Sequence, residues 1–344
     1  MQDITFVTCA HDAWGAESSL ALLAKEFIRR GHAIIFVARE GAALDYLAKE
    51  VPEAKTVAVP SRRSRVAQLL ETARAVPKAD SLVVVFSLDL MPLPWLARGR
   101  PMIFDIHDTP PKLITRRAMK LLARSYVGAI AISKYAASWG EGFRNVVVVP
   151  RPITRFATPK EYKAAKEKLC VGIVGRISPE KNIEFAIESV KAAREQGIAA
   201  ELVIYGEHFG NQKSYMESVL ALGTEALGSS FIWKSRRPAS EIYGDIDVLM
   251  VANGREPSGR TVGEAMGAGL PVLVPDCGGA REYLTDGAEG VVYRHGDVES
   301  VVSSLRMLES SELRARMGRL GADRIQKERR ASVIAASYLK GLAL

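Results

Sequence analysis

Residues 255–272 read REPSGRTVGEAMGAGLPV and lie between two apolar runs, residues 248–252 and 272–274. This pattern predicts a strand, a loop containing glycine, and a helix that begins near Gly259 and Arg260. The first amides of a helix have no partner within the helix, and the helix dipole is positive at that end. The stretch therefore predicts a phosphate-binding site at the start of a helix.

Two glutamates flank this helix start. Glu256 stands just before the helix, where its carboxylate can accept hydrogen bonds from hydroxyl groups, and Glu264 lies inside the helix. Because a carboxylate repels phosphate, the partner expected for Glu264 is a diol such as a ribose. The alternative is that Glu256 caps the helix and that Glu264 is a solvated helix residue.

A second stretch, VGRISPEKN at residues 174–182, also follows a predicted strand. Ser178 suits the N-cap of a helix and Pro179 its first turn. Arg176 and Lys181 then lie near the same edge of the sheet, where two cations could stabilise a departing diphosphate without a metal ion. The alternative is that both are solvated surface charges.

The alternation of β-branched runs and segments of helical period extends along the chain and starts again after a break. Runs such as residues 82–86 and 146–149 lack polar alternation, which is typical of parallel strands buried on both faces. The break, residues 149–155, contains two prolines and has no period. We therefore expect an α/β protein of two Rossmann-like βαβ domains, residues 1–152 and 153–328, that face each other across a cleft.

The composition excludes disordered and fibrous proteins. The chain has 344 residues, of which 48% are hydrophobic and 25% charged, as in globular proteins. No apolar run is long enough to span a bilayer, and the first residues lack the basic start of a signal peptide. Cys9, Cys170 and Cys277 are far apart, which argues against a disulfide scaffold. We expect a cytoplasmic protein, with the inner face of the membrane as a second location.

The net charge of +8 is concentrated in one half of the chain. Residues 1–152 contain 21 Lys and Arg against 14 Asp and Glu, whereas residues 153–344 contain 26 against 25. Basic clusters occur at residues 112–124 and at Arg62, Arg63 and Arg65. They favour a membrane surface or an anionic acceptor as the partner, with a solvated helix face as the alternative. Nucleic acid is not expected, because no binding signature accompanies the basic residues.

Two further patterns have features of a binding site. Asp245-Ile246-Asp247 has the spacing of a metal-binding Asp-x-Asp pair, but it precedes an apolar run rather than ending one. The cysteines and the other histidines lack the spacing of metal ligands, so no metal site is predicted. Glu207 and His208 follow a strand end and are alternative residues of a ligand pocket.

The spacing Glu-Pro-x-Gly-x4-Glu-Ala-Met-x-Ala-Gly-Leu-Pro-Val, from Glu256 to Val272, resembles the Glu-x7-Glu signature of retaining GT-B glycosyltransferases, especially glycosyltransferase family 4 (glycosyl transferases group 1). The resemblance implies that Glu256 contacts the donor sugar and Glu264 the nucleotide ribose. The amides of the intervening residues would contact the sugar and the phosphates; these are Ser258, Gly259, Arg260 and Thr261. The family usually has an aromatic residue where Ser258 stands, so the pocket wall is expected to differ there.

Three other elements resemble the same family. Gly175-Arg176-x4-Lys181 is similar to the Gly-Arg-x4-Lys element, whose basic pair grips the donor diphosphate. Gly15 falls where the family has a glycine-rich turn near the phosphate and the acceptor. His107, in the run Phe104-Asp105-Ile106-His107-Asp108, matches a histidine that contacts the donor sugar. Ser133 ends a strand similar to one in the family and is given a structural role.

The implied activity is metal-independent transfer of a sugar, with retention, from a nucleotide-diphosphate sugar to a hydroxyl acceptor. The acceptor would be a cell-envelope glycan, a glycolipid or a small-molecule glycoside. A UDP-sugar is favoured over a GDP-sugar, and no separate cofactor is expected. The backbone near residues 233–237 would hold the base. The alternatives are a nucleotide-sugar epimerase or hydrolase of the same fold, and a basic protein that binds nucleic acid or sugar without catalysis.

The family resemblance also suggests a place for the end of the chain. Residues 329–344 predict a helix with an apolar stripe of Val333, Ile334, Tyr338 and Leu339. GT-B enzymes commonly return their last helix to the first domain, so we expect this stripe to be buried there. The alternative is that it completes the second domain.

Overall fold

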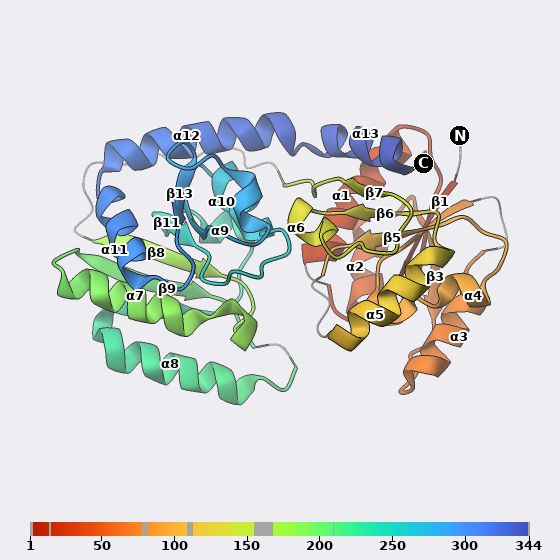
Figure 1. The fold of residues 1–344 in the computed structure, drawn as a ribbon, viewed down its shortest axis with the longest axis horizontal. Helices are drawn as coiled ribbons and strands as arrows, with labels where there is room; N and C mark the ends of the chain where they lie inside the picture. The colour runs from red at the N-terminus through yellow and green to blue at the C-terminus, as the bar shows by residue number, and fades with distance from the viewer. Residues whose placement is uncertain are drawn as a thin grey trace. The chain divides into compact units, whose positions relative to one another are not determined.

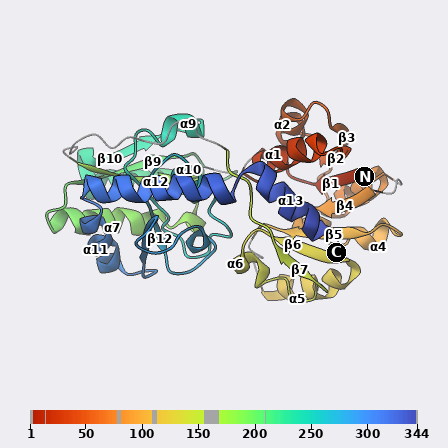
Figure 2. The same ribbon diagram turned by 90° about the horizontal axis from the view of Figure 1, so that it is seen from above.

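The computed structural model describes residues 3–13, 15–77, 81–108, 113–154, 168–208 and 210–342. The chain divides into two compact units. Unit 1 comprises Met1–Pro152 and Arg329–Leu344, and unit 2 comprises Ile153–Glu328. Each unit is a parallel sheet with helices on both faces (Figures 1 and 2).

The sheet of unit 1 contains seven parallel strands among the described residues, in the order β3-β2-β1-β4-β5-β6-β7. The strands are β1 (Asp3–Thr8), β2 (Ile34–Arg39), β3 (Lys55–Val59), β4 (Ser81–Val85), β5 (Met102–Ile106), β6 (Gly128–Ala131) and β7 (Val146–Val148). β4 is buried along its whole length, as its apolar run predicts. The same prediction for residues 146–149 is wrong in part, because β7 is the last strand in the sheet order and Val148 is 39% exposed. The strand order reverses between β1 and β4, and open α/β sheets bind ligands beside such a reversal, at the carboxyl ends of the strands.

Helices cover both faces of this sheet. They are α1 (Gly15–Arg29), α2 (Ala42–Glu50), α3 (Arg65–Ala75), α4 (Leu93–Leu96), α5 (Leu113–Leu122), α6 (Lys134–Ala137) and α13 (Ala331–Leu342), with short 3₁₀ helices η1 (Leu88–Leu90) and η2 (Ala123–Ser125). α13 packs against α1 although the two are far apart in sequence (Figure 1). Ile334 and Tyr338 are buried in the same core as Phe6 and Phe27. The rings of Phe27 and Tyr338 lie 5.8 Å apart, so the last helix is part of the core of unit 1. Val333, expected in the buried stripe, is instead 41% exposed.

The sheet of unit 2 contains six parallel strands among the described residues, in the order β10-β9-β8-β11-β12-β13. The strands are β8 (Leu169–Val174), β9 (Ala200–Tyr205), β10 (Phe231–Lys234), β11 (Val248–Met250), β12 (Val272–Pro275) and β13 (Gly290–Tyr293). Here the order reverses between β8 and β11, which are hydrogen-bonded neighbours. The loops that follow these two strands therefore emerge side by side.

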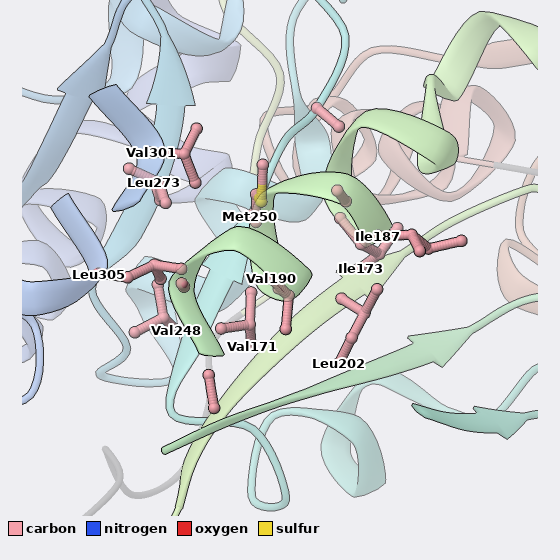
Figure 3. Packing of buried hydrophobic residues seen from close by; sticks show 14 of the residues in the cluster. Val171, Ile173, Ile187, Val190, Leu202, Val248, Met250, Leu273, Val301 and Leu305 are labelled. Atoms are coloured by element: carbon pink, nitrogen blue, oxygen red, sulfur yellow. The ribbon is translucent and has the colours of Figure 1, made fainter. Parts of the chain in front are cut away.

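The helices of unit 2 are α7 (Ile183–Glu195), α8 (Lys213–Leu227), α9 (Ala239–Ile242), α10 (Arg260–Gly267), α11 (Val298–Met307) and α12 (Ser311–Glu328), with 3₁₀ helices η3 (Pro179–Lys181), η4 (Gly228–Ser230) and η5 (Ala280–Tyr283). Figure 3 shows how α7 fits the sheet: Ile187 and Val190 meet Val171 and Leu202 of the central strands. These side chains are almost fully buried, which fixes the position of the loops at the ends of β8 and β9.

One local expectation is corrected. Ser178 and Pro179 do not open an α-helix; they open the single turn of η3, and Ser178 makes no side-chain cap bond there. α7 begins only at Ile183, because Asn182 adopts a left-handed conformation with φ 51° that interrupts the helix. Asparagine tolerates this conformation better than most residues. The interruption turns the chain between Lys181 and α7.

No helix in the described part of the chain has both the length and the apolar character required to cross a membrane. Lys112, the first residue of the expected basic helix, Trp14, beside the expected glycine turn, and Arg155, at the end of the expected linker, lie outside the described residues.

Candidate functional site: an ion pair at the start of helix α10

Lys181 and Glu256 meet at the carboxyl edge of the sheet of unit 2. Lys181 ends η3, after β8, and Glu256 lies in the loop after β11. The Lys181 Nζ lies 2.6 Å from the Glu256 Oε2. The lysine side chain is 28% exposed and the glutamate 16%, so the pair is partly shielded from water. The structure thus places a lysine ammonium and a carboxylate in contact at the carboxyl edge of the sheet, where open α/β sheets bind their ligands.

Glu256 is held by two further donors. The Asn253 Nδ2 donates to the Glu256 Oε2 at 3.2 Å, and the Gly259 backbone N–H donates to Oε1 at 3.3 Å. Burial raises the pKa of Glu256, but the charge of Lys181 and these hydrogen bonds outweigh it and hold the pKa below its usual value. Glu256 is therefore ionised at neutral pH. Its Oε1 thus contacts the backbone amide of Gly259, the residue from which α10 starts.

Glycines shape the backbone of this loop. Gly259 has φ 77°, a conformation that L-residues rarely adopt, and it is the residue from which α10 starts. The Gly279 N–H donates to the Glu256 carbonyl at 2.7 Å. A Cβ on Gly279 would lie 2.1 Å from the Pro257 carbonyl oxygen, so no side chain fits there. The Glu256 loop is fixed by direct backbone contact with the next loop of the sheet.

Glu264 lies on α10, one turn beyond its start, and is not solvated. The Arg260 Nε donates to the Glu264 Oε1 at 2.7 Å, and the Tyr243 hydroxyl donates to Oε2 at 3.0 Å. The side chain of Glu264 is 13% exposed. Burial and the Glu264 carboxylate raise the pKa of Tyr243 well above its usual value, so this hydroxyl remains a donor. The alternative that Glu264 is a solvated helix residue is therefore wrong.

The other residues expected at this edge occupy different settings. Arg176 is exposed in the loop between β8 and η3. Ser258 is buried, and its Oγ lies 3.4 Å from the Tyr283 hydroxyl, so it faces the protein interior. Thr261 is in the first turn of α10. The structure thus brings Glu256 together with Lys181 and Gly259. Arg176 lies five residues before Lys181 in the same connection after β8 and is exposed.

The two aspartates of the Asp-x-Asp pattern have separate partners. The Asp247 Oδ2 accepts a hydrogen bond from the Cys170 backbone N–H at 3.1 Å and is buried. The Asp245 Oδ2 instead accepts from the Tyr205 hydroxyl at 2.5 Å and from the Lys234 Nζ at 2.7 Å. Among the described residues, no group of three or more His, Cys, Asp and Glu side chains could hold a metal ion.

Glu207 and His208 run beside the loop of Arg176. The Ile177 N–H donates to the Glu207 carbonyl at 2.9 Å, and the Trp233 Nε1 donates to the Gly206 carbonyl at 2.9 Å. Trp233 is 42% exposed at the end of β10. These contacts are made by backbone atoms of the 206–208 loop, and they position the neighbouring segment 233–237.

In unit 1, His107 follows β5 and lines a small pocket with Phe86, Leu88, Phe104, Asp108 and Met119. The His107 Nδ1 lies 3.0 Å from the Asp105 Oδ1. Burial lowers the pKa of His107. The hydrogen bond to Asp105 and the charge of Asp108 raise it by more, so the pKa lies above its usual value. Gly15, also in unit 1, is the first residue of α1, directly after the turn that follows β1.

Sequence reasoning missed Asn253, Tyr243 and Asp105. Asn253 is a polar residue between an apolar strand and a glycine, and Asp105 is the one charge in an otherwise apolar strand; both were visible as patterns. Tyr243 lies in the segment before β11, and the fold brings it to Glu264, 21 positions further along the chain. No local sequence pattern therefore indicates this contact.

Comparisons with known proteins give one family match and several similar proteins. Residues 154–324 match the family model described as glycosyl transferases group 1. A GDP-mannose-dependent alpha-mannosyltransferase of Mycobacterium tuberculosis is 30% identical over 136 residues, which are 38% of this chain and 32% of that protein. The capsular polysaccharide biosynthesis glycosyltransferase CapM of Staphylococcus aureus is 26% identical over 176 residues, which are 51% of this chain and 46% of that protein. The chain thus spans less than half the length of either relative.

Solved structures share the fold along the whole chain. Anabaena Alr3699/HepE in complex with UDP and glucose has a TM-score of 0.84 at 18% identity and covers 100% of both chains. Sucrose-phosphate synthase from Thermosynechococcus elongatus has a TM-score of 0.80 at 16% identity, with 100% of this chain and 98% of that one covered. The prediction of two Rossmann-like domains of the GT-B type is confirmed. The chain has the GT-B fold, and its residues 154–324 match the family model of glycosyl transferases group 1.

Proposed function

We propose that the chain is a glycosyltransferase that moves a sugar from a nucleotide-diphosphate sugar to a hydroxyl acceptor. The observation that carries the proposal is the contact of Lys181 and Glu256 at the start of α10. A lysine, a carboxylate and helix amides at one sheet edge offer partners for a diphosphate and for sugar hydroxyls. The match to glycosyl transferases group 1 covers this same segment.

The pair suggests how the site changes when the donor arrives. A diphosphate carries more negative charge than Glu256 and would draw the Lys181 ammonium toward itself. Glu256 would then be left with Asn253 and the Gly259 amide, with acceptor capacity for a sugar hydroxyl. In this account Lys181 and Arg176 stabilise the leaving diphosphate in place of a metal ion. Glu264 would accept from the ribose, with Arg260 and Tyr243 holding its carboxylate.

We further propose that transfer retains the anomeric configuration. The leaving phosphate would help to remove the proton from the acceptor hydroxyl on the same face of the sugar, while Glu256 fixes the sugar. The family resemblance gives His107 the sugar as its partner as well. UDP is our first choice of nucleotide, because the structurally similar Alr3699/HepE was solved with UDP and with UDP-glucose. A relative named as GDP-mannose-dependent makes GDP-mannose the competing donor in any test.

A membrane contact is proposed for unit 1. α3 and α4 pack together and expose Val66, Leu70, Trp95 and Leu96, next to the basic segment with Arg62, Arg63 and Arg65. Exposed apolar and cationic side chains on neighbouring elements suit the surface of an anionic bilayer. Replacing the three arginines by glutamine should reduce co-sedimentation with phosphatidylglycerol vesicles. Equal sedimentation of the variant and the wild type would remove this proposal and leave the transferase proposal intact.

The test of the function is a panel of nucleotide sugars. A donor at about 100 times its dissociation constant should add roughly 2.7 kcal/mol to the free energy of unfolding. Donors that stabilise the chain are then incubated with candidate acceptors, and proton NMR follows the anomeric signals. Transfer with retained configuration supports the proposal. Release of free sugar without transfer, even with acceptor present, would indicate a hydrolase, and no stabilisation by any nucleotide sugar would contradict the proposal.

A further inference from the structure

Asp105 is the centre of a buried polar network in unit 1. Its side chain is 0% exposed, and both carboxylate oxygens are occupied. The Oδ1 faces the His107 Nδ1 at 3.0 Å and also accepts from the Arg151 Nη2, while the Oδ2 accepts from the Tyr338 hydroxyl at 2.9 Å. These partners come from the end of β5, from the segment after β7 and from α13.

We propose that Asp105, Arg151 and Tyr338 form a positioning network that holds the His107 imidazole with its proton on Nδ1 and presents Nε2 to the pocket. Helix α13 thereby contributes to the site, although it has no place in the sequence motifs. The inference rests on the proposed function in one respect: it takes His107 as a residue of the sugar site.

The chemistry of the carboxylate dictates the tautomer. Burial raises the pKa of Asp105, but the charge of Arg151 and the contact with His107 outweigh it, so its pKa lies below the usual value. An ionised carboxylate is an acceptor only, so the ring nitrogen that faces it must carry a hydrogen. The neutral His107 therefore keeps its lone pair on Nε2. Nε2 lies 3.7 Å from the Asp108 Oδ2, whose side chain is 70% exposed at the mouth of the pocket.

Packing fixes the plane of the ring as well. The Arg151 guanidinium carbon lies 5.2 Å from the centre of the Phe86 ring, and the Phe86 and His107 rings lie 5.5 Å apart at 39°. The charged and titratable groups that face His107 are Asp105, Asp108 and Arg151, and Tyr338 acts on it through Asp105. Rotation of the imidazole would break the Asp105 contact and leave a buried carboxylate oxygen with one donor fewer.

Stability alone does not account for this network. Apolar side chains of similar volume stabilise a core as well as a buried ion pair does, and often better. A buried carboxylate that faces Nδ1 does, however, select one tautomer of a histidine. The network therefore fits a requirement of His107, and that requirement makes a specific spectroscopic prediction.

The test is NMR of the full chain labelled with ¹⁵N-histidine. In the wild type, long-range ¹H–¹⁵N correlations should show that neutral His107 carries its proton on Nδ1, with a pKa above the ordinary value near 6.5. In Asp105→Asn, the pKa of His107 should fall, because only the charge of Asp108 then opposes burial and Arg151. Wild-type His107 with its proton on Nε2 would overturn the proposal.

Tyr338→Phe keeps the ring in the core and removes only the hydroxyl, so it also answers the case in which Asp105→Asn does not fold. Loss of this donor makes Asp105 a stronger acceptor, so the pKa of His107 should rise. Turnover should fall about 2- to 10-fold, the factor expected for one hydrogen bond, with UDP affinity unchanged. The matched control is Tyr126→Phe, a buried tyrosine of unit 1 whose hydroxyl donates to the Met91 carbonyl at 3.1 Å. It should leave the His107 pKa and turnover at wild-type values.

The two proposals fail in different ways. If no nucleotide sugar is turned over, the proposed function fails, and the tautomer and pKa of His107 still test the network. If the wild type is active and Tyr338→Phe shifts the His107 pKa no more than Tyr126→Phe does, the network proposal fails and the function stands.

Discussion

The Nζ of Lys181 lies 2.6 Å from the Oε2 of Glu256, although the two residues are 75 positions apart. The resemblance to GT-B enzymes assigns them to different parts of a donor, the diphosphate and the sugar. In the structure their charges neutralise each other. In the proposed function, a donor diphosphate takes Lys181 as its partner and leaves Glu256 to the sugar.

Glu256→Gln should separate sugar chemistry from nucleotide binding. The amide keeps the shape but loses the charge, so contacts with sugar hydroxyls weaken by about 1.5–3 kcal/mol and turnover falls about 10- to 100-fold. UDP affinity should stay the same or increase, because Lys181 no longer has a competing partner. Steady-state kinetics and calorimetry check this, with the exposed Glu195→Gln on α7 as the control. Normal turnover in Glu256→Gln would show that the assignment is wrong.

Glu264→Gln should weaken UDP binding about tenfold and leave inorganic pyrophosphate binding unchanged, because its proposed partner is the ribose. Tyr243→Phe removes one of the donors that orient this carboxylate and should act in the same direction with a smaller effect. Competition between UDP and pyrophosphate measures both. An equal loss of affinity for UDP and for pyrophosphate would mean that Glu264 stabilises α10 and does not contact the ribose.

The Lys181–Glu256 pair should make stability depend on acidity. The pKa of Glu256 is lower in the folded chain than its ordinary value, mainly because Lys181 outweighs burial. Such a carboxylate contributes stability that is complete above the unfolded-state pKa, near 4.3, and is lost as the pH falls through the lower folded-state pKa. Chemical unfolding of wild type and Glu256→Gln should therefore differ most near neutral pH and least near pH 3. A difference that does not change with pH would contradict the pairing.

The stripe on α13 offers a paired test of the fold. Ile334 is 2% exposed in the core of unit 1, whereas the neighbouring Val333 is 41% exposed. Ile334→Ala should lower the free energy of unfolding by about 2–5 kcal/mol. Val333→Ala should change it by less than about 0.5 kcal/mol. Similar values for both variants would mean that α13 is not part of the core.

The sequence predicts well what depends on local composition. Strands such as β4 read as unbroken apolar runs because they are buried on both faces, and residues 259–260 mark a helix start because glycine suits the conformation that precedes it. The identity of the chemistry-bearing side chains on α10 and η3 follows from the same motifs.

What the sequence could not predict are contacts set by strand order. Lys181 reaches Glu256 because β8 and β11 are neighbours, and no local pattern encodes that neighbourhood. Asp105 was visible as a charge in an apolar strand, but its partner Tyr338 is 233 positions away. The sequence also predicts too early a start for the helix after β8. The left-handed conformation of Asn182 ends η3, so α7 begins only at Ile183.

The central claim is that Lys181, Arg176 and the start of α10 bind a donor diphosphate without a metal ion. Calorimetric titration of UDP into the chain in the presence of EDTA tests it most directly. The account predicts binding at one site in the wild type, weakened about 10- to 100-fold in Lys181→Ala and also weakened in Arg176→Ala. Binding that requires a divalent metal and is lost in Asp247→Asn, or UDP affinity unchanged in Lys181→Ala, would contradict it.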